Sequence, residues 1–370
     1  MKTAVDIKAV IYDENEKENE IIRRFLQVKG PEFLSFNNDE ELVNQIWNIK
    51  KHYNSKEVII LKPFKGRFFQ ICPGSRGVTC CNYRLVNTCF NCFYNCTYCF
   101  LNSYLNSFGI TQFTNLEVLY KEIDLFLKDI DPGFVYRIGS GEFTDSLMMD
   151  DITGTGEALI NKFNAYKNVM FELKTKSDNV DHLLGIREKG SAVLAWSLNT
   201  ERNIAKYENG TALLKERIAA AKKAVEAGYF LAFHFDPVII YNDWENDYKE
   251  LIHTLFKNID PEKVVWISLG CFRYGPGFKD ILRDKFPDEE LTLEEMFPGV
   301  DGKYRYLKNK RTEIYKTIKN YINNYTHKPF IYLCMESEDM WHSVFDKHYD
   351  SAMALENDFG AYLKDKFINT

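Results

Sequence analysis

Short apolar segments alternate with amphipathic helical patterns between residues 82 and 271, and this alternation restricts the fold more strongly than any other feature of the sequence. The segments are continuous apolar runs, which is typical of parallel strands covered by helices. Right-handed β–α crossovers then favour an α/β fold built on a partial (β/α)6 barrel, with an open doubly wound sheet as the alternative. The predicted strands lie at residues 82–87, 133–139, 168–175, 191–198, 229–236 and 263–270, and the predicted helices at 115–130, 156–166, 179–190, 211–228 and 243–258.

Further elements flank the barrel in this chain of 370 residues, which is long enough for one large domain with appendages. Residues 1–68 show a strand–helix–strand–helix–strand pattern and predict a small N-terminal α/β domain, either a packing or partner module or a part of substrate binding. The barrel takes residues 69–272. Residues 273–370 form a C-terminal extension with one more strand near 328–337 and a basic, tyrosine-bearing segment at 303–324. Gly190 and Gly228 follow predicted helices, where glycine commonly ends a helix.

Charge and hydropathy limit the partners and the location that we expect for the protein. The formal net charge of −6 argues mildly against bulk electrostatic binding of duplex DNA, although it leaves room for a local basic patch. No run of eighteen apolar residues occurs, so we expect no membrane span and no membrane partner. The first twenty residues turn acidic where a secretory signal would be apolar, and we therefore expect a cytoplasmic protein.

Seven of the nine cysteines fall between residues 72 and 99, which indicates a metal or cofactor rather than disulfides in a reducing compartment. Cys89, Cys92, Cys96 and Cys99 lie within eleven residues. Two pairs separated by three residues are cramped for structural zinc, and the spacing differs from the ferredoxin run C-x2-C-x2-C-x3-C. Without Cys89, the pattern Cys92-x3-Cys96-x2-Cys99 could hold three irons of a [4Fe–4S] cluster and leave the fourth open for chemistry.

This C-x3-C-x2-C pattern resembles the signature of the radical S-adenosylmethionine (SAM) enzymes. The resemblance implies a [4Fe–4S] cluster on Cys92, Cys96 and Cys99 whose open iron binds SAM, and an external one-electron reductant of the flavodoxin or ferredoxin type. It also implies cleavage to a 5′-deoxyadenosyl radical, which is chemistry that the cofactor supplies. The residue before the third cysteine, here Tyr98, is expected to pack on adenine. The superfamily's full or partial barrel, with the cluster loop after its first strand, agrees with the strand pattern.

Polar side chains stand at the predicted carboxyl ends of five successive strands, where barrel enzymes place their sites. They are Glu142 and Asp145, Lys174 and Lys176, Ser197 and Asn199, His234 and Asp236, and Arg273 and Tyr274. The resemblance assigns Glu142, in a Gly-Glu pair, to the SAM ammonium group, and we expect Lys176 at the carboxylate and Ser197 as a further polar contact. His234 and Asp236 are candidate substrate contacts, with a mutually satisfied pair under the barrel mouth as the alternative.

A closer resemblance, to the spore photoproduct lyase family, rests on NCFYNCTYCFLNSYLN, TKSDNVDHLL, AWSLNTE and KYRYLK in matching order and spacing. True lyases of that family reverse a thymine-dimer-like lesion in spore DNA and use a cysteine–tyrosine hydrogen relay. Here Glu142 stands at the position of the relay cysteine and Phe100 at that of the relay tyrosine. Part of the lesion-binding pair is retained as Arg305-Tyr306. Cys271 is a candidate substitute hydrogen donor, with a buried small apolar residue as the alternative.

The leading hypothesis is a radical SAM enzyme, related to these lyases, that abstracts hydrogen from an undetermined substrate. Nucleic acid is a candidate because side chains of 303–324 could stack on bases and neutralise phosphates, although the segment could equally be an amphipathic helix with a solvated basic face. The alternatives are true DNA photoproduct repair with another hydrogen donor and a non-enzymatic iron–sulfur or zinc scaffold. The remaining cysteines of the cluster region either pack or bind a second metal, and they are Cys72, Cys80, Cys81 and Cys89.

Overall fold

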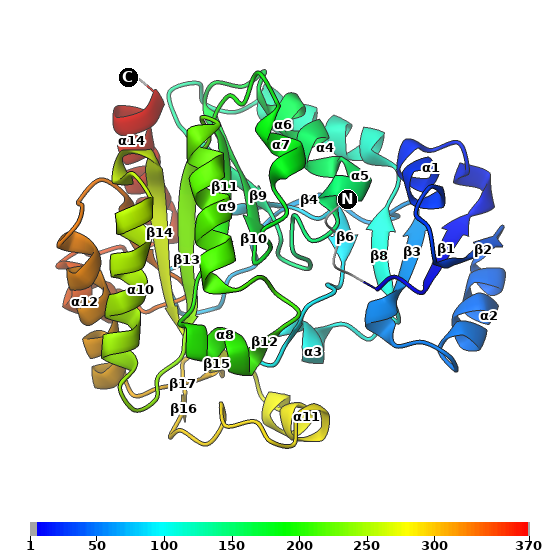
Figure 1. The fold of residues 1–370 in the computed structure, drawn as a ribbon. Helices are drawn as coiled ribbons and strands as arrows, with labels where there is room; N and C mark the ends of the chain where they lie inside the picture. Colours follow the sequence, from blue (N-terminus) through cyan, green and yellow to red (C-terminus); the bar gives the residue numbers. More distant parts are fainter. Residues whose placement is uncertain (1–5, 369–370) are drawn as a thin grey trace.

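The largest element of the fold is an open, curled sheet of eight strands, seen in a computed structural model that describes residues 6–368 (Figure 1). Its strand order is β18-β14-β13-β11-β10-β9-β5-β4, and all neighbours pair in parallel except β4 and β5. The strands are β4 (Phe69–Ile71), β5 (Arg84–Val86), β9 (Tyr136–Ser140), β10 (Val169–Thr175), β11 (Ala192–Ser197), β13 (Phe230–Val238), β14 (Val264–Cys271) and β18 (Phe330–Leu333).

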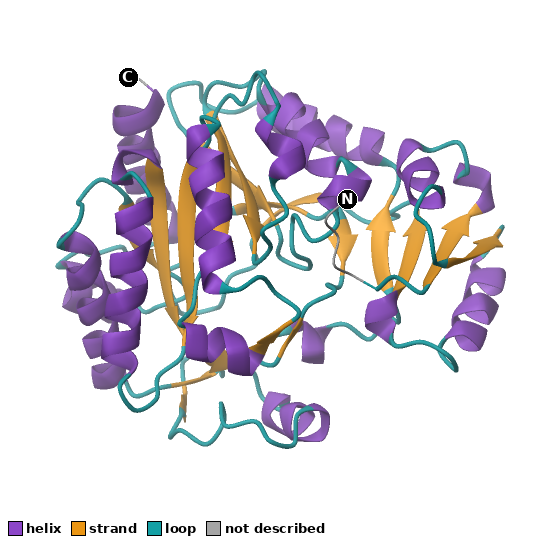
Figure 2. Ribbon diagram, in the orientation of Figure 1, coloured by secondary structure: helices purple, strands orange, loops and turns teal. Residues whose placement is uncertain are grey.

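Helices cover the outer face of this sheet (Figures 1 and 2). In α9, for example, Leu214, Ile218 and Ala221 form the apolar stripe that is buried against the sheet. The longer helices are α4 (Leu116–Lys128), α6 (Thr155–Phe163), α9 (Leu214–Glu226), α10 (Trp244–Asn258), α12 (Lys308–Asn323) and α14 (Ala352–Leu363). The shorter ones are α3 (Leu101–Tyr104), α5 (Asp150–Thr153), α7 (Asp181–Leu184), α8 (Glu201–Tyr207), α11 (Phe278–Lys285) and α13 (Glu338–Phe345).

The predicted partial barrel is confirmed, and each of the six predicted strands is present. The helix predicted at 179–190 was too long, because α7 ends at Leu184 before Gly185, a residue that weakens helices. Gly190 therefore does not end a helix; its positive φ of 52° lies in the turn before β11. Gly228 follows α9 with φ 95°, as predicted.

A second, parallel sheet of the order β2-β1-β3-β8 carries β6 antiparallel at its edge. Its elements are β1 (Ala9–Asp13), α1 (Glu20–Leu26), β2 (Glu32–Phe36), α2 (Asp39–Ile49), β3 (Val58–Lys62), β6 (Cys89–Phe90) and β8 (Ile110–Phe113). Strands from beyond residue 68 thus complete this sheet, and β18 from beyond residue 272 completes the barrel sheet. The boundaries 1–68, 69–272 and 273–370 remain predictions.

The register of the large sheet decides which side chains share its inner face. Ser197 pairs with His234, His234 with Ser268, and Ser268 with Tyr332. Residues paired across neighbouring strands point to the same face, and residues two apart along a strand do so as well. Asp236 and Cys334 therefore also face inward. We call the carboxyl ends of these strands, where the inner face opens, the barrel mouth.

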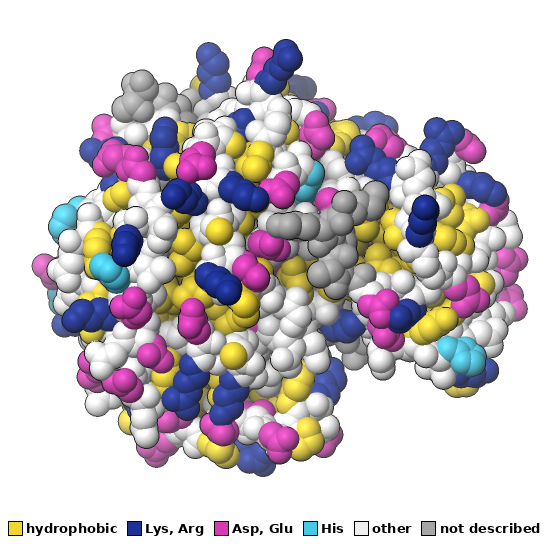
Figure 3. Space-filling model, viewed as in Figure 1, with side chains coloured by type: hydrophobic (Ala, Val, Ile, Leu, Met, Phe, Trp, Pro, Cys, Tyr) yellow, Lys and Arg dark blue, Asp and Glu magenta, His cyan; other side chains and the backbone are white. Residues whose placement is uncertain are grey.

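The visible surface carries side chains of both charges (Figure 3). Figure 3 shows basic and acidic side chains intermingled over the visible face, rather than a broad region of one sign. Among residues 6–368, no helix has both the length and the apolar character needed to cross a membrane.

Candidate active site

The three cysteines of the C-x3-C-x2-C motif lie on one loop between β6 and α3. Within it, β7 (Asn95–Cys96) pairs antiparallel with β12 (Glu208–Asn209), and the Thr97 amide donates to the Tyr207 carbonyl at 2.8 Å. These bonds fasten the loop to the segment that follows α8. Cys96 is buried, whereas Cys92 and Cys99 are partly exposed. The loop is thus anchored through its middle cysteine.

The surroundings of the loop disfavour the thiolate forms of Cys92 and Cys96. Burial raises the pKa of Cys92 to about 12 and that of Cys96 well above its usual range, although the charges of Lys56 and Lys176, respectively, act in the opposite direction. Among the described residues, no three His, Cys, Asp or Glu side chains already stand in a metal-ligand arrangement. Ligation of Cys92, Cys96 and Cys99 to iron therefore stays a prediction from the motif, and it requires their deprotonation.

Tyr98 joins a buried polar network that connects the cluster loop to the barrel. Its hydroxyl donates to Glu208, which also accepts from Arg217 at 2.5 Å, and Arg217 donates to the Ser197 carbonyl at 2.8 Å. Burial alone would raise the pKa of Glu208, but the charges of Arg217 and Lys176 lower it overall. The hydrogen bonds through Glu208 and Arg217 thus connect Tyr98 to Ser197, and both are predicted SAM contacts.

Lys176 lies beside this network. Its amino group is 5.7 Å from the centre of the Tyr98 ring, and its backbone amide donates to Asp145 at 2.6 Å. Burial lowers the pKa of Lys176, but the thiolate form of Cys96 and the charge of Glu208 act against burial, and the pKa is raised overall. The side chain is therefore a cation next to the cluster loop, which suits a carboxylate ligand.

Glu142 carries a buried oxygen that lacks a partner. Its Oε2 accepts no hydrogen bond from the described residues. Burial raises the pKa of Glu142, while Lys174 and the side-chain amides of Gln70 and Asn87 act in the opposite direction. A buried carboxylate oxygen without a donor costs stability, and an ammonium group would satisfy it. The position therefore fits the ammonium group that SAM presents.

A second polar group on the inner face, which we call the barrel floor, is saturated with hydrogen bonds. It consists of Tyr83, Glu172, His234, Trp266 and Ser268. Glu172 accepts from Trp266 Nε1 at 3.0 Å and from the Tyr83 hydroxyl, and it lies 2.6 Å from Nε2 of His234. Nδ1 of His234 lies 2.6 Å from Ser268 Oγ. Both ring nitrogens of His234 are occupied, so this predicted substrate contact is a bonded part of the floor.

Asp236, the other predicted contact on β13, pairs with Arg273 rather than with His234. The two contacts measure 3.0 and 3.2 Å, and Nη2 of Arg273 also lies 3.3 Å from the sulfur of Cys334. Burial alone would raise the pKa of Asp236, but the Arg273 charge lowers it overall. Both side chains of the pair retain some exposure at the barrel mouth, so Asp236 is placed where a ligand could meet it.

Cys271 points to the opposite face of β14. Its backbone amide donates to the Tyr315 hydroxyl on α12 at 2.9 Å, and the residue is 2% exposed. Burial raises the pKa of this thiol well above its usual range. These surroundings are those of a packed core cysteine, and they do not bring the predicted hydrogen donor to the barrel mouth.

The Arg305-Tyr306 pair is also buried. Arg305 forms an ion pair with both carboxylate oxygens of Asp301 and lies in a small sheet of β15 (Arg273–Tyr274), β17 (Tyr304–Arg305) and β16 (Phe297–Pro298). Tyr306 is 1% exposed and Tyr315 is fully buried. These two tyrosines therefore offer no surface for base stacking. The segment 303–324 is largely α12, an amphipathic helix with exposed lysines.

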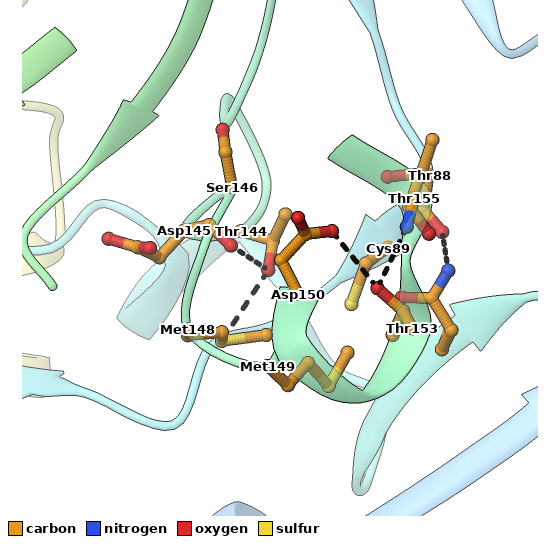
Figure 4. A pocket seen from close by; sticks show the side chains of 11 residues that line it. Thr88, Cys89, Thr144, Asp145, Ser146, Met148, Met149, Asp150, Thr153 and Thr155 are labelled. Atoms are coloured by element: carbon orange, nitrogen blue, oxygen red, sulfur yellow. Dashed lines mark hydrogen bonds between the residues drawn. The ribbon is translucent and has the colours of Figure 1, made fainter. Parts of the chain in front are cut away.

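A small pocket lies between the cluster loop, β8 and the loop that follows β9 (Figure 4). Cys89 lines it together with Thr144, Asp150 and Thr153, and it is 2% exposed. Asp150 lies 2.7 Å from Nε2 of His182 and accepts from the Gly156 amide. Cys89 thus sits among hydroxyl and carboxylate side chains in this pocket, and its omission from the cluster ligands stays a prediction.

Sequence reasoning missed Glu172, Glu208 and Arg217, which hold the two networks together. A signal was available for two of them. Arg217 interrupts the apolar stripe of α9, and Glu172 interrupts the apolar run of β10. A charge inside a stripe that must be buried indicates a buried partner elsewhere in the chain.

Comparison with known proteins decides the family. The family model for spore photoproduct lyase matches residues 76–333. The chain belongs to the spore photoproduct lyase family. It is 28% identical to spore photoproduct lyase of Bacillus subtilis (strain 168) over 244 residues, which cover 63% of this chain and 71% of that protein. It is 24% identical to the Clostridium acetobutylicum enzyme over 286 residues, which cover 75% of this chain and 83% of that protein.

Solved structures of this family share the fold. A spore photoproduct lyase variant with bound AdoMet and dinucleoside spore photoproduct superposes with a TM-score of 0.74 at 21% identity, covering 90% of this chain and 99% of that one. A complex with dinucleoside spore photoproduct gives a TM-score of 0.76 and covers 88% and 98%. The chain is therefore a radical SAM, lyase-related enzyme on the family's partial barrel, and the family implies SAM and a [4Fe–4S] cluster as cofactors.

Proposed function

We propose that this enzyme abstracts a hydrogen atom from a thymine-containing, DNA-like substrate bound at the barrel mouth. One observation carries the SAM-binding part of the proposal: Oε2 of Glu142, which is buried and accepts no hydrogen bond from the described residues, lies at the barrel mouth, at the residue that the Gly-Glu motif assigns to SAM. When bound, the cluster and SAM supply a 5′-deoxyadenosyl radical. The chain's own residues bind and orient the reactants.

Each predicted contact has a role in this proposal. Cys92, Cys96 and Cys99 hold the cluster, Glu142 accepts from the ammonium group of SAM, and Lys176 pairs with its carboxylate. The Tyr98 ring packs on adenine while its hydroxyl stays with Glu208. Ser197 adds a polar contact, and Arg217 fixes the backbone at Ser197. A one-electron reductant of the flavodoxin or ferredoxin type delivers the electron.

The substrate class rests on family membership and on the relatives that bind dinucleoside spore photoproduct. A second candidate is full reversal of the thymine lesion, the reaction after which the family that matches residues 76–333 is named. It needs a hydrogen donor other than the family relay, because Glu142 and Phe100 occupy the relay positions. Asp236 with Arg273 is the substrate contact we favour at the mouth, since both are charged and partly exposed.

Anaerobic reconstitution tests the proposal. The protein should bind about four irons, and dithionite with SAM should release 5′-deoxyadenosine faster when dinucleoside spore photoproduct is present. Replacing Cys92, Cys96 and Cys99 by Ala should abolish both. A colourless, zinc-loaded protein that leaves SAM intact would contradict the enzyme and favour the scaffold. If 5′-deoxyadenosine is released at the same rate with and without dinucleoside spore photoproduct, only the substrate class would be contradicted.

A further inference from the structure

The smaller, N-terminal sheet meets the cluster loop at the first cysteine of the motif. The contact is made by the short 3-10 helix η2 (Ser55–Glu57), which directly precedes β3 in that sheet. The cluster loop leaves the edge strand β6 of the same sheet. The predicted N-terminal α/β domain, for which the proposed function gives no role, therefore borders the start of the cluster motif.

Asn91, the residue before Cys92, turns the chain at this contact. Its φ of 74° lies in the left-handed region, which asparagine adopts more readily than most residues. Its side chain accepts from the Cys92 amide at 2.9 Å and donates to the Gly109 carbonyl at 3.0 Å. Ser55 Oγ accepts from the Gly109 amide at 3.0 Å and lies 3.5 Å from Nδ2 of Asn91. The turn before Cys92 is thus bonded both to η2 and to the residue that precedes β8.

Lys56 brings a positive charge into this contact. Its amino group donates to the Cys92 carbonyl at 2.6 Å and to Oδ1 of Asn91 at 2.8 Å. Both acceptors are uncharged, and no Asp or Glu of the described residues forms an ion pair with Lys56. The residue is partly buried. Because a partly buried charge is screened less than a surface ion pair, this ammonium group acts on whatever binds beside Cys92.

Two other cations near the loop differ from Lys56. Arg217 is neutralised by Glu208, whose carboxylate lies 2.5 Å away. Lys176 lies on the barrel side of the loop, beside the Tyr98 ring, where the proposed function uses it for the SAM carboxylate. Lys56 approaches from the opposite, N-terminal sheet and touches the backbone of a predicted cluster ligand directly.

We propose that Lys56 is a positioning residue that holds Cys92 in place for the cluster and makes the bound cluster easier to reduce. The inference rests on the proposed function, in which Cys92, Cys96 and Cys99 hold the cluster. Reduction moves one electron from the flavodoxin- or ferredoxin-type reductant to the cluster and makes it more negative by one charge. A fixed positive charge beside a ligand stabilises that reduced state, since net charge and hydrogen bonding set the potential of iron–sulfur clusters. The N-terminal sheet thus takes part in electron uptake.

Redox titration of the reconstituted holoprotein, followed by the electron paramagnetic resonance signal of the reduced cluster, tests the charge. In Lys56→Met and Lys56→Gln the midpoint potential should fall by about 30 mV, a threefold change in the reduction equilibrium at about 59 mV per tenfold. Lys56→Arg keeps the charge and should match the wild type. Lys51→Met, at an exposed lysine of the same region, is the matched control. Wild-type potentials in both Lys56→Met and Lys56→Gln would overturn the proposal.

Hydrogen exchange of the full chain without cluster tests the positioning separately. The amides of residues 90–96, mapped by peptide mass spectrometry, should exchange at least threefold faster in Lys56→Met than in the wild type. Lys56→Arg should restore slow exchange, and Lys51→Met should leave it unchanged. Equal exchange in Lys56→Met and the wild type would overturn the positioning role, whether or not the variant binds iron.

The two levels of the argument fail differently. A wild type that binds no iron after reconstitution would remove the proposed function itself. A wild-type cluster that cleaves SAM, but whose potential is independent of Lys56, would remove only this inference.

Discussion

The barrel floor and the barrel mouth are built from the same kinds of side chain but differ in how completely these are bonded. On the floor, Glu172 has three partners and both nitrogens of His234 are used. At the mouth, Glu142 keeps a buried oxygen without a donor. Buried polar groups in a finished fold are normally paired. The difference teaches that His234 is bonded into the barrel, whereas Glu142 retains a free acceptor, as the proposed SAM contact requires.

The largest effect should follow from removing Glu172, the central acceptor of the barrel floor. Glu172→Ala removes the acceptor of three buried donors, and breaking such a network costs about 3–5 kcal/mol. We expect a large loss in the free energy of unfolding, measured by urea denaturation of the protein without cofactors. Glu226→Ala, at an exposed position of α9, is the control and should change little. A Glu172→Ala protein as stable as the wild type would contradict the structural role of the floor.

Lowering the pH should reduce the contribution of the barrel floor to the free energy of unfolding, over a pH range set by Glu172. Burial would raise the pKa of Glu172, but the His234 charge and the hydrogen bonds lower it to about 2, below an unfolded value near 4.3. The contribution is therefore fully present above about pH 5 and is lost as pH falls toward 2, up to about 3 kcal/mol. Urea denaturation of the wild type and Glu172→Gln from pH 7 to pH 3 measures this. The stability difference should shrink on acidification, and a constant difference would rule out this linkage.

Glu142→Gln should lower the affinity for SAM and leave stability unchanged, whereas a floor variant should lower stability. Loss of the charge that meets the SAM ammonium should cost about 1.5–3 kcal/mol of binding, or about 10- to 100-fold in affinity. Stability without cofactors should not fall, because the removed oxygen has no partner. Calorimetric titration of SAM into the reconstituted protein, beside urea denaturation, separates the two effects. Glu226→Gln should match the wild type, and a destabilised Glu142→Gln protein with normal SAM affinity would place Glu142 with the floor.

The sequence predicts the elements and the chemical character of the mouth better than it predicts the pairing there. Short apolar runs located the six predicted barrel strands and β18, since burial of such runs depends on local composition, but they did not reveal the short β4. His234 and Asp236 lie two residues apart on one face, but their partners, Glu172 and Arg273, come from other strands. Such partners are set by strand register, which a single sequence does not display.

The smallest effect should come from Tyr98, which contacts both kinds of region. Tyr98→Phe removes the hydroxyl that donates to Glu208 but leaves Glu208 paired with Arg217, so the loss in stability should be about 1 kcal/mol. The ring remains for adenine, and SAM affinity should stay within about twofold. Tyr98→Leu, the paired variant, removes ring and hydroxyl and should lower affinity as well. A Tyr98→Phe protein that lost SAM binding but kept its stability would show that the hydroxyl serves ligand binding. The hydrogen bond from Tyr98 to Glu208 would then not be what attaches the cluster loop to the barrel.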